Sequence, residues 1–557
     1  MKKTGKILAV SLAGISMLGA LSACNKPYVP DGNKSNVCKV KAVRAGYEVD
    51  WLYAIAEEFN KTYADEGYSV DIVLADTTID MGNEIKTPRR NDTDLYFEYN
   101  SVNKLIESSR SILGANGGAL LEDLTDLYNS KAVGTDKQEQ GEKIIDRFDS
   151  DVLASCKYTG VLNGYDGIYS MYYQGGSGGI YVNERVLAEK NYTFDDLLTT
   201  DSLLKVVRET APANPLDTTA FFPVAWGGTV PGYWNWLAQV LFAQYEGREE
   251  YHDFWRFIPE EGTAIENGYT VYQDRGMYEA VRVIELLSNR DFTVPGTSSF
   301  THTAAQARIF NGTSLLMVNG DWLYKEMEKD YKDKLTDVVA IKTPVISALG
   351  VKLKLCGTQH SVGETCANCD AKLKAIVKDV DAGKDKNAIA SDNGVSEEVA
   401  QTIIDARNYY LREIDEAFAI TIPSYADGKD VAKLFIRFMF SDEMNDVYRK
   451  HTYVSLFPNR TSEPDKTKMS QIEIALYDKI NNKNSQPIYQ FRDCELRVRT
   501  GLESFFVQGG DKYQYAALSY SHSQHPNEDK TRKMLDEGYE TLVTGWTEYI
   551  QRAGLSE

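Results

Sequence analysis

The alternation of short apolar segments with an amphipathic helix near the N-terminus constrains the fold more than any other sequence feature. Residues 38–44 and 68–74 predict strands, and residues 50–63 between them place apolar side chains at helical spacing. A third strand is expected at 94–99. Strands that alternate with helices indicate an α/β protein with a mainly parallel sheet.

Three later segments predict further helices. Residues 193–196 have the sequence of a capping box, which opens a helix, and residues 431–439 are apolar on one side. The stretch of about 355–415, rich in Lys, Asp and Ala, predicts a helical insertion.

The N-terminus has the pattern of a bacterial export signal. Three lysines precede an apolar run at 7–21, which is too short to cross a bilayer comfortably. The run ends in Leu21-Ser22-Ala23-Cys24, which resembles the lipobox of bacterial lipoproteins. We therefore expect residues 1–23 to be a signal peptide, Cys24 to carry the acyl group, and residues 24–37 to form a tether. An ordinary secretory signal with an incidental cysteine is the alternative.

Composition narrows the class of protein and of ligand. About 530 residues follow the leader, enough for two or more domains. No later stretch approaches the ~18 apolar residues of a membrane span, so we expect contact with the membrane through the lipid anchor only. The formal net charge of −20 argues against a nucleic-acid ligand, because that affinity depends on Lys and Arg.

Three cysteines and a histidine lie close together in the predicted insertion. Cys356, His360, Cys366 and Cys369 can supply three thiolates and an imidazole to a tetrahedral zinc ion. A disulfide between Cys356 and either Cys366 or Cys369 is the simpler interpretation in an exported chain, and free thiols are the third. In each case the role is structural.

Three segments carry a resemblance to a known family. Residues 310–322, with the sequence FNGTSLLMVNGDW, resemble the crossover segment of family 1 extracellular solute-binding proteins, the group that includes maltose-binding protein. Residues 178–187 and 430–444 are similar to two further segments of that family, in the same order along the chain.

The resemblance implies a two-lobed, periplasmic-binding-protein-like α/β fold of type II, with several chain crossings at a hinge. The expected boundaries are 38–165 and 313–425 for lobe 1, and 166–312 and 426–557 for lobe 2. Such a protein catalyses nothing and needs no cofactor. It acts as a monomer on the outer face of the membrane, where it binds a solute and presents it to the permease of an ABC importer.

Aromatic side chains beside polar groups indicate a carbohydrate ligand, because sugars present apolar ring faces and hydroxyl edges. The richest supply is residues 225–236, where we expect Trp226, Tyr233 and Trp234 to contact the ligand and Trp236 to belong to the core. A buried aromatic cluster is the alternative.

The remaining candidates follow predicted strands. In lobe 1 these are Tyr47, Glu98 and Tyr99, at the carboxyl ends of strands, where α/β sheets bind ligands. The resemblance adds Trp322 as a platform for a sugar ring. Asp321 is expected to accept a sugar hydroxyl or to cap the next helix.

Two other functions stay open at this point. A secreted glycoside hydrolase would use paired carboxylates, whose separation the sequence does not give. A binding protein for a non-sugar solute would have similar walls. Residues 175–179 match the G-x-S-x-G motif of serine hydrolases, but residues 180–182 predict a strand where that motif requires a helix.

Overall fold

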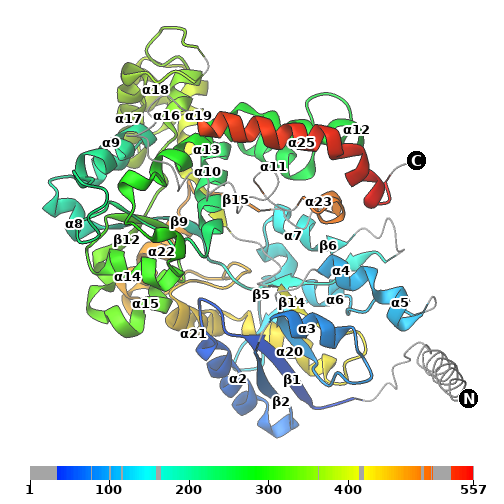
Figure 1. Cartoon of the computed structure of the whole chain (residues 1–557). Coiled ribbons are helices and arrows are strands. Elements are labelled where there is room, and N and C mark those ends of the chain that lie inside the picture. Colours follow the sequence, from blue (N-terminus) through cyan, green and yellow to red (C-terminus); the bar gives the residue numbers. More distant parts are fainter. Residues whose placement is uncertain are drawn as a thin grey trace, which may run out of the picture.

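The computed structural model describes residues 34–76, 78–98, 102–114, 117–158, 165–361, 363–412, 419–490, 495–502, 505 and 529–555. The chain forms two α/β lobes, each built on its own sheet (Figure 1). This confirms the predicted two-lobed fold. The signal peptide, Cys24 and most of the predicted tether lie outside the described residues.

Lobe 1 is built on a five-stranded sheet in the order β2-β1-β3-β14-β8. β1 runs parallel to β2 and β3, whereas β14 runs antiparallel to β3 and β8. The strands are β1 (Val37–Val43), β2 (Ser69–Ala75), β3 (Leu95–Glu98), β8 (Met171–Tyr172) and β14 (Ala419–Thr421). The three strands predicted near the N-terminus are therefore confirmed.

Helices cover both faces of the lobe 1 sheet. On one face, Phe97 packs 5.6 Å from Trp51 of α2 (Asp50–Thr62), and α20 (Lys429–Met439) and α21 (Asp442–Thr452) join the same layer. On the other face, the neighbouring Tyr96 belongs to a separate apolar cluster with Met81 and Ile85 of α3 (Thr78–Ile85). Successive residues of a strand point to opposite faces, so β3 contributes to both layers.

Lobe 2 is built on a four-stranded sheet in the order β10-β11-β9-β12. Its strands are β9 (Gly178–Asn183), β10 (Val224–Ala225), β11 (Leu316–Gly320) and β12 (Val338–Ile341). Its main helices are α9 (Thr200–Thr210), α10 (Trp234–Glu246), α11 (Arg248–Arg256), α13 (Arg275–Leu287), α14 (His302–Phe310) and α15 (Leu323–Tyr331). The capping box at Thr193 and Asp196 is present and opens a short 3-10 helix. A strand follows residues 175–179, as predicted, so the serine-hydrolase elbow is not formed.

The described elements show three places where the chain passes between the lobes. It crosses from β8 to β9, from β13 (Tyr409–Arg412) towards β14, and from α21 towards α22 (Gln471–Asn481). Single bridges pair Gln174 with Leu456 and Ser177 with Arg412, so the crossing segments lie side by side.

The predicted lobe boundaries are wrong for the later part of the chain, and the first boundary, at 165/166, lies too early because β8 belongs to the lobe 1 sheet. Residues 313–425 were expected in lobe 1, yet β11 and β12 both pair with β9 of lobe 2, and only β14 returns to the lobe 1 sheet. Residues 426–557 were expected in lobe 2, yet α20 and α21 pack on α2. In Figure 1 the yellow α20 lies beside the blue strands β1 and β2, and α21 lies beside the blue helix α2. Strand pairing over such sequence distances is decided by tertiary contacts, which local patterns do not contain.

The predicted insertion is helical and belongs to lobe 2. It contains α17 (Ala367–Asp381), α18 (Lys386–Asn393) and α19 (Glu397–Asn408), which pack together and against α16 (Ser347–Lys352) and α10. β13 then pairs with β15 (Gln486–Tyr489), and α25 (Lys530–Arg552) packs on α13. Among the described helices, none combines the length and apolar character that a membrane crossing requires.

Candidate ligand-binding site

Four aromatic side chains meet where the two lobes face each other. Trp322 follows β11, and its ring centroid lies 5.1 Å from that of Trp236 and 6.1 Å from that of Tyr233. Tyr233 and Trp236 stack at 4.4 Å at the start of α10. Tyr47, from the loop after β1, meets Trp322 edge-on at 5.9 Å. The loop after β1, the start of α10 and the end of β11 therefore contribute to one aromatic cluster.

The indole of Trp322 is held between two glycine positions. A Cβ at Gly46 would lie 2.6 Å from Cγ of Trp322, and a Cβ at Gly320 would also overlap the ring. Only glycine permits this close approach. Trp322 is 7% exposed, so its position is fixed by contacts from both lobes.

A buried carboxylate adjoins the aromatic cluster. Asp321 is fully buried, the Tyr47 hydroxyl donates a hydrogen bond to its Oδ1, and the Ser177 N–H donates to Oδ2 at 2.8 Å. Asp321 does not cap α15, which has no side-chain cap. Its carboxylate instead joins lobe 1, lobe 2 and the crossing that contains Ser177.

Burial is the largest influence on the pKa values of Asp321 and its neighbours. Burial raises the pKa of Asp321, while the Tyr47 hydroxyl and the ammonium group of Lys479 oppose that rise. Burial also lowers the pKa of Lys479, against the attraction of Asp321. The pKa of Tyr47 is raised by burial and by the neighbouring carboxylate.

Several polar groups around Asp321 are not satisfied by the protein. Within the described part of the chain, no hydrogen-bond partner is found for Ser177 Oγ, the Tyr181 hydroxyl or Lys479 Nζ, nor for the Gln174 amide. Tyr181 and Lys479 both interact electrostatically with Asp321. Buried polar groups normally have partners. This surplus of donors and acceptors therefore fits a polar ligand.

The aromatic residues predicted from 225–236 are divided between this cluster and the core. Trp226 and Trp234 pack against each other at 6.1 Å and are 4% and 1% exposed. Trp236, expected in the core, is buried at 6% exposure and also contacts Trp322. Tyr233 and Trp236 are three residues apart and share a helical face, whereas Trp234 points elsewhere. The i, i+3 spacing from Tyr233 is the sequence signal that could have placed Trp236 in this cluster.

The other predicted residues lie outside the described structure or away from the aromatic cluster. Glu98 ends β3, but its side chain and the whole of Tyr99 lie outside the described structure. Cys356, His360, Cys366 and Cys369 come together in the insertion, beside α16 and α17. That region lies away from α15, which follows Trp322 (Figure 1).

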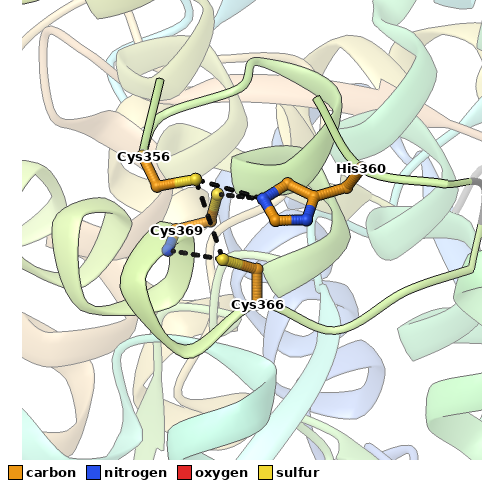
Figure 2. Close-up of side chains that lie close together, drawn as sticks. All are labelled: Cys356, His360, Cys366 and Cys369. Carbon is orange, nitrogen blue, oxygen red and sulfur yellow. Dashed lines mark hydrogen bonds between the residues drawn. The ribbon is translucent and has the colours of Figure 1, made fainter. Parts of the chain in front are cut away.

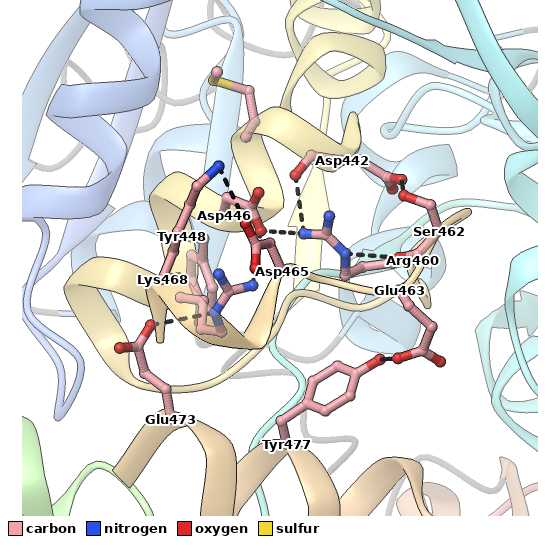
Figure 3. Close-up of polar contacts among 12 residues, drawn as sticks. Asp442, Asp446, Tyr448, Arg460, Ser462, Glu463, Asp465, Lys468, Glu473 and Tyr477 are labelled. Carbon is pink, nitrogen blue, oxygen red and sulfur yellow. Dashed lines mark hydrogen bonds and ion pairs between the residues drawn. The ribbon is translucent and has the colours of Figure 1, made fainter. Parts of the chain in front are cut away.

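Charged side chains after α21 form a separate polar network. Arg460 pairs with Asp446 and donates to the carbonyl oxygens of Asp442 and Ser462, both at 3.0 Å (Figure 3). Tyr477 of α22 donates to Glu463 at 2.9 Å. These contacts fix the third crossing between the lobes, so Arg460 has a structural role in this arrangement.

The sequence places the chain in a family. The model of the family described as bacterial extracellular solute-binding protein matches residues 54–361, more than half of the chain. The chain belongs to this family. The predicted resemblance is therefore confirmed, and the aromatic cluster lies between the two lobes of this solute-binding protein.

Solved structures share the fold over nearly the whole length. The solute-binding protein RafE in complex with raffinose has 12% identity and a TM-score of 0.51, and the match covers 92% of this chain and 99% of that one. A chitin oligosaccharide binding protein has 11% identity and a TM-score of 0.52, with 91% and 99% covered. A protein from work on xylan utilisation by Caldanaerobius polysaccharolyticus has 11% identity and a TM-score of 0.53, with 91% and 98% covered. A search of curated protein sequences finds no significant match.

Proposed function

We propose that this solute-binding protein captures an oligosaccharide between its lobes and releases it unchanged to an ABC importer. The main observation behind the proposal is that aromatic and polar side chains lie next to each other between the lobes. Tyr47, Tyr233, Trp236 and Trp322 supply aromatic faces, and Asp321 lies beside them among polar groups that have no hydrogen-bond partner within the described residues. Sugar rings need both surfaces at once.

The named ligands of similar structures agree with this chemistry. Two of the proteins that share the fold are described with raffinose and with chitin oligosaccharide. At 11–12% identity they support the class of ligand and do not select one sugar.

The leader and the family support the proposed location on the outer face of the cell membrane. The family is extracellular, and the lipobox at Leu21–Cys24 supports attachment to the outer face of the cell membrane by an acyl group on Cys24. A lipid-anchored monomer would keep the captured solute close to the permease. The importer's preference for closed lobes would couple binding to transport.

A thermal-shift screen of the mature chain tests the proposal. The panel contains mono- and oligosaccharides, amino acids and short peptides. A ligand at about 100 times its Kd adds about 2.7 kcal/mol to the free energy of unfolding, so a true ligand raises Tm clearly. We expect at least one oligosaccharide to do so. Stabilisation by a peptide or amino acid alone would contradict the carbohydrate assignment.

A further inference from the structure

The four cysteine and histidine side chains of the insertion converge on one point. Their ligand atoms all lie within 4.8 Å of one another (Figure 2). Nε2 of His360 is 3.1 Å from Sγ of Cys356 and 3.7 Å from Sγ of Cys369. Sγ of Cys366 is 3.8 Å from Sγ of Cys356.

The separations of 3.7 and 3.8 Å are close to those of a tetrahedral metal site, and the separation of 3.1 Å is shorter. Zinc bonds of about 2.3 Å to sulfur and about 2.0 Å to nitrogen, at the tetrahedral angle, place two sulfurs about 3.8 Å apart and sulfur and nitrogen about 3.5 Å apart. A disulfide needs sulfurs at about 2.05 Å. The three thiols are free in the structure, so the predicted disulfide is not formed.

The backbone around the cluster is arranged to present the sulfurs. Cys366 is the N-cap of α17, and its sulfur accepts a hydrogen bond from the N–H of Cys369 at 3.4 Å. Gly357 follows Cys356 with φ of +79°, a left-handed conformation that turns the chain towards His360. A thiolate that accepts a backbone N–H is well suited to bind a cation.

A carboxylate lies on the side of the His360 ring that faces away from the sulfurs. Nε2 of His360 faces the sulfurs, and Nδ1 lies 3.6 Å from Oε2 of Glu364. The same oxygen accepts the N–H of Ser361 at 2.9 Å. A carboxylate on the outer nitrogen is the usual support for a metal-bound histidine.

The described residues of the loop that carries these ligands are mostly exposed. Apart from His360, residues 357–361 and 363–365 are exposed, whereas Cys369 is fully buried on α17. Exposed loop residues contribute little to packing, so a metal that joins them to a buried helix residue adds order. A bond from Cys356 and His360 to Cys366 and Cys369 would join this loop to the helix.

We propose that Cys356, His360, Cys366 and Cys369 bind one Zn²⁺ ion that fastens the loop between α16 and α17. The ion would be held by three thiolates and Nε2 of His360, and the displaced thiol protons would pass to solvent. Four protein ligands close the coordination sphere, so the site is structural and leaves no position for catalysis. The proposal does not depend on the solute that the lobes bind.

Metal analysis of the whole mature chain tests the site. The protein is reduced, stripped with a chelator, reloaded with Zn²⁺ or Co²⁺ and dialysed. We expect about one Zn²⁺ per chain, and a Co²⁺ form with thiolate-to-metal charge transfer and the intense visible bands of tetrahedral cobalt. Reduced wild-type protein that binds no metal, or a cobalt spectrum of octahedral oxygen ligation, would overturn the proposal.

Variants separate this site from incidental metal binding. Cys366→Ser and His360→Ala should lose the tetrahedral cobalt spectrum, and Glu364→Gln should weaken zinc affinity by about 10- to 100-fold through its effect on His360. Cys38→Ala removes a buried thiol outside the cluster and should keep one zinc. Equal zinc binding by Cys366→Ser and Cys38→Ala would also overturn the proposal. So would a disulfide within the cluster that forms in the presence of equimolar zinc.

Discussion

Trp322 and Trp234 are both predicted ligand contacts of lobe 2, but their surroundings differ. Trp322 meets Tyr47 of the opposite lobe, whereas Trp234 is 1% exposed and packs against Trp226. We expect Trp322→Ala to weaken oligosaccharide binding by roughly 1 to 3 kcal/mol, because a sugar ring loses its stacking face. Calorimetric titration measures this loss.

Trp234→Ala is the matched control. Truncating a core tryptophan should lower the free energy of unfolding by about 3 to 5 kcal/mol and leave the affinity of the folded protein unchanged. If Trp322→Ala instead shows only this loss of stability, Trp322 packs the hinge and is no ligand platform.

The hydrogen bond from Tyr47 to Asp321 joins residues of opposite lobes. Opening the lobes would separate them, so Tyr47→Phe should weaken ligand binding by about 1.5 to 3 kcal/mol, the range for hydrogen bonds to charged groups. Tyr324→Phe is the control, since the Tyr324 hydroxyl donates to the Val338 carbonyl within lobe 2 at 2.9 Å. Equal affinities for the two variants would show that the Tyr47 bond does not stabilise the closed form.

Three of the predicted site residues lie together in the structure. Tyr47 was predicted at the end of a lobe 1 strand, and Asp321 and Trp322 were predicted after a strand in the segment that resembles the family; the two strands belong to different sheets, so their meeting depends on how the lobes face each other. Lys479 and Ser177 were missed. Their proximity to Asp321 arises from the crossings between lobes, and no local pattern marks it.

At the scale of elements, the start of α13 carries an unfavourable carboxylate. Burial and then Glu246 and Glu260 raise the pKa of Asp274 from 3.8 to about 7. Between these values the folded chain keeps the proton and the unfolded chain releases it, so stability falls as pH rises from about 4 to 7. Asp274→Asn should therefore stabilise the protein at pH 8, by about 2 to 4 kcal/mol, and have little effect at pH 4.

Chemical denaturation of both proteins at the two pH values measures this difference. A benefit of Asp274→Asn that is the same at pH 4 and pH 8 would mean that the carboxylate is not responsible. Asp195→Asn is a suitable control, because Asp195 is an exposed acid that forms a surface ion pair with Lys378.

The sequence predicted the helices and strands better than it predicted which strands pair with each other. Helix and strand periods placed α2, α20 and the first three strands within about two residues, because one face of each is apolar. The assignment of β11 to lobe 1 was wrong, because β11 pairs antiparallel with β9 of lobe 2. The local sequence of β11 does not indicate which strand it pairs with.

For the whole molecule, the leader predicts how the protein is retained. Cys24→Ala removes the acyl acceptor, so we expect the protein to leave the membrane fraction of its native host and to appear in the soluble exported fraction. Fractionation and intact mass of the membrane-extracted wild type measure this. A wild type without an acyl mass on Cys24 would instead indicate an ordinary secretory signal.

In the proposed function, the closed lobes hold an oligosaccharide and do not cleave it. The most direct measurement is calorimetric titration of the mature protein with the oligosaccharide that raises Tm most, followed by chromatography of the recovered sugar. We predict saturation at one sugar per chain and recovery of the sugar intact after prolonged incubation. Shortened products that accumulate beyond one equivalent would show turnover and contradict the account, as would the absence of saturable binding by any carbohydrate.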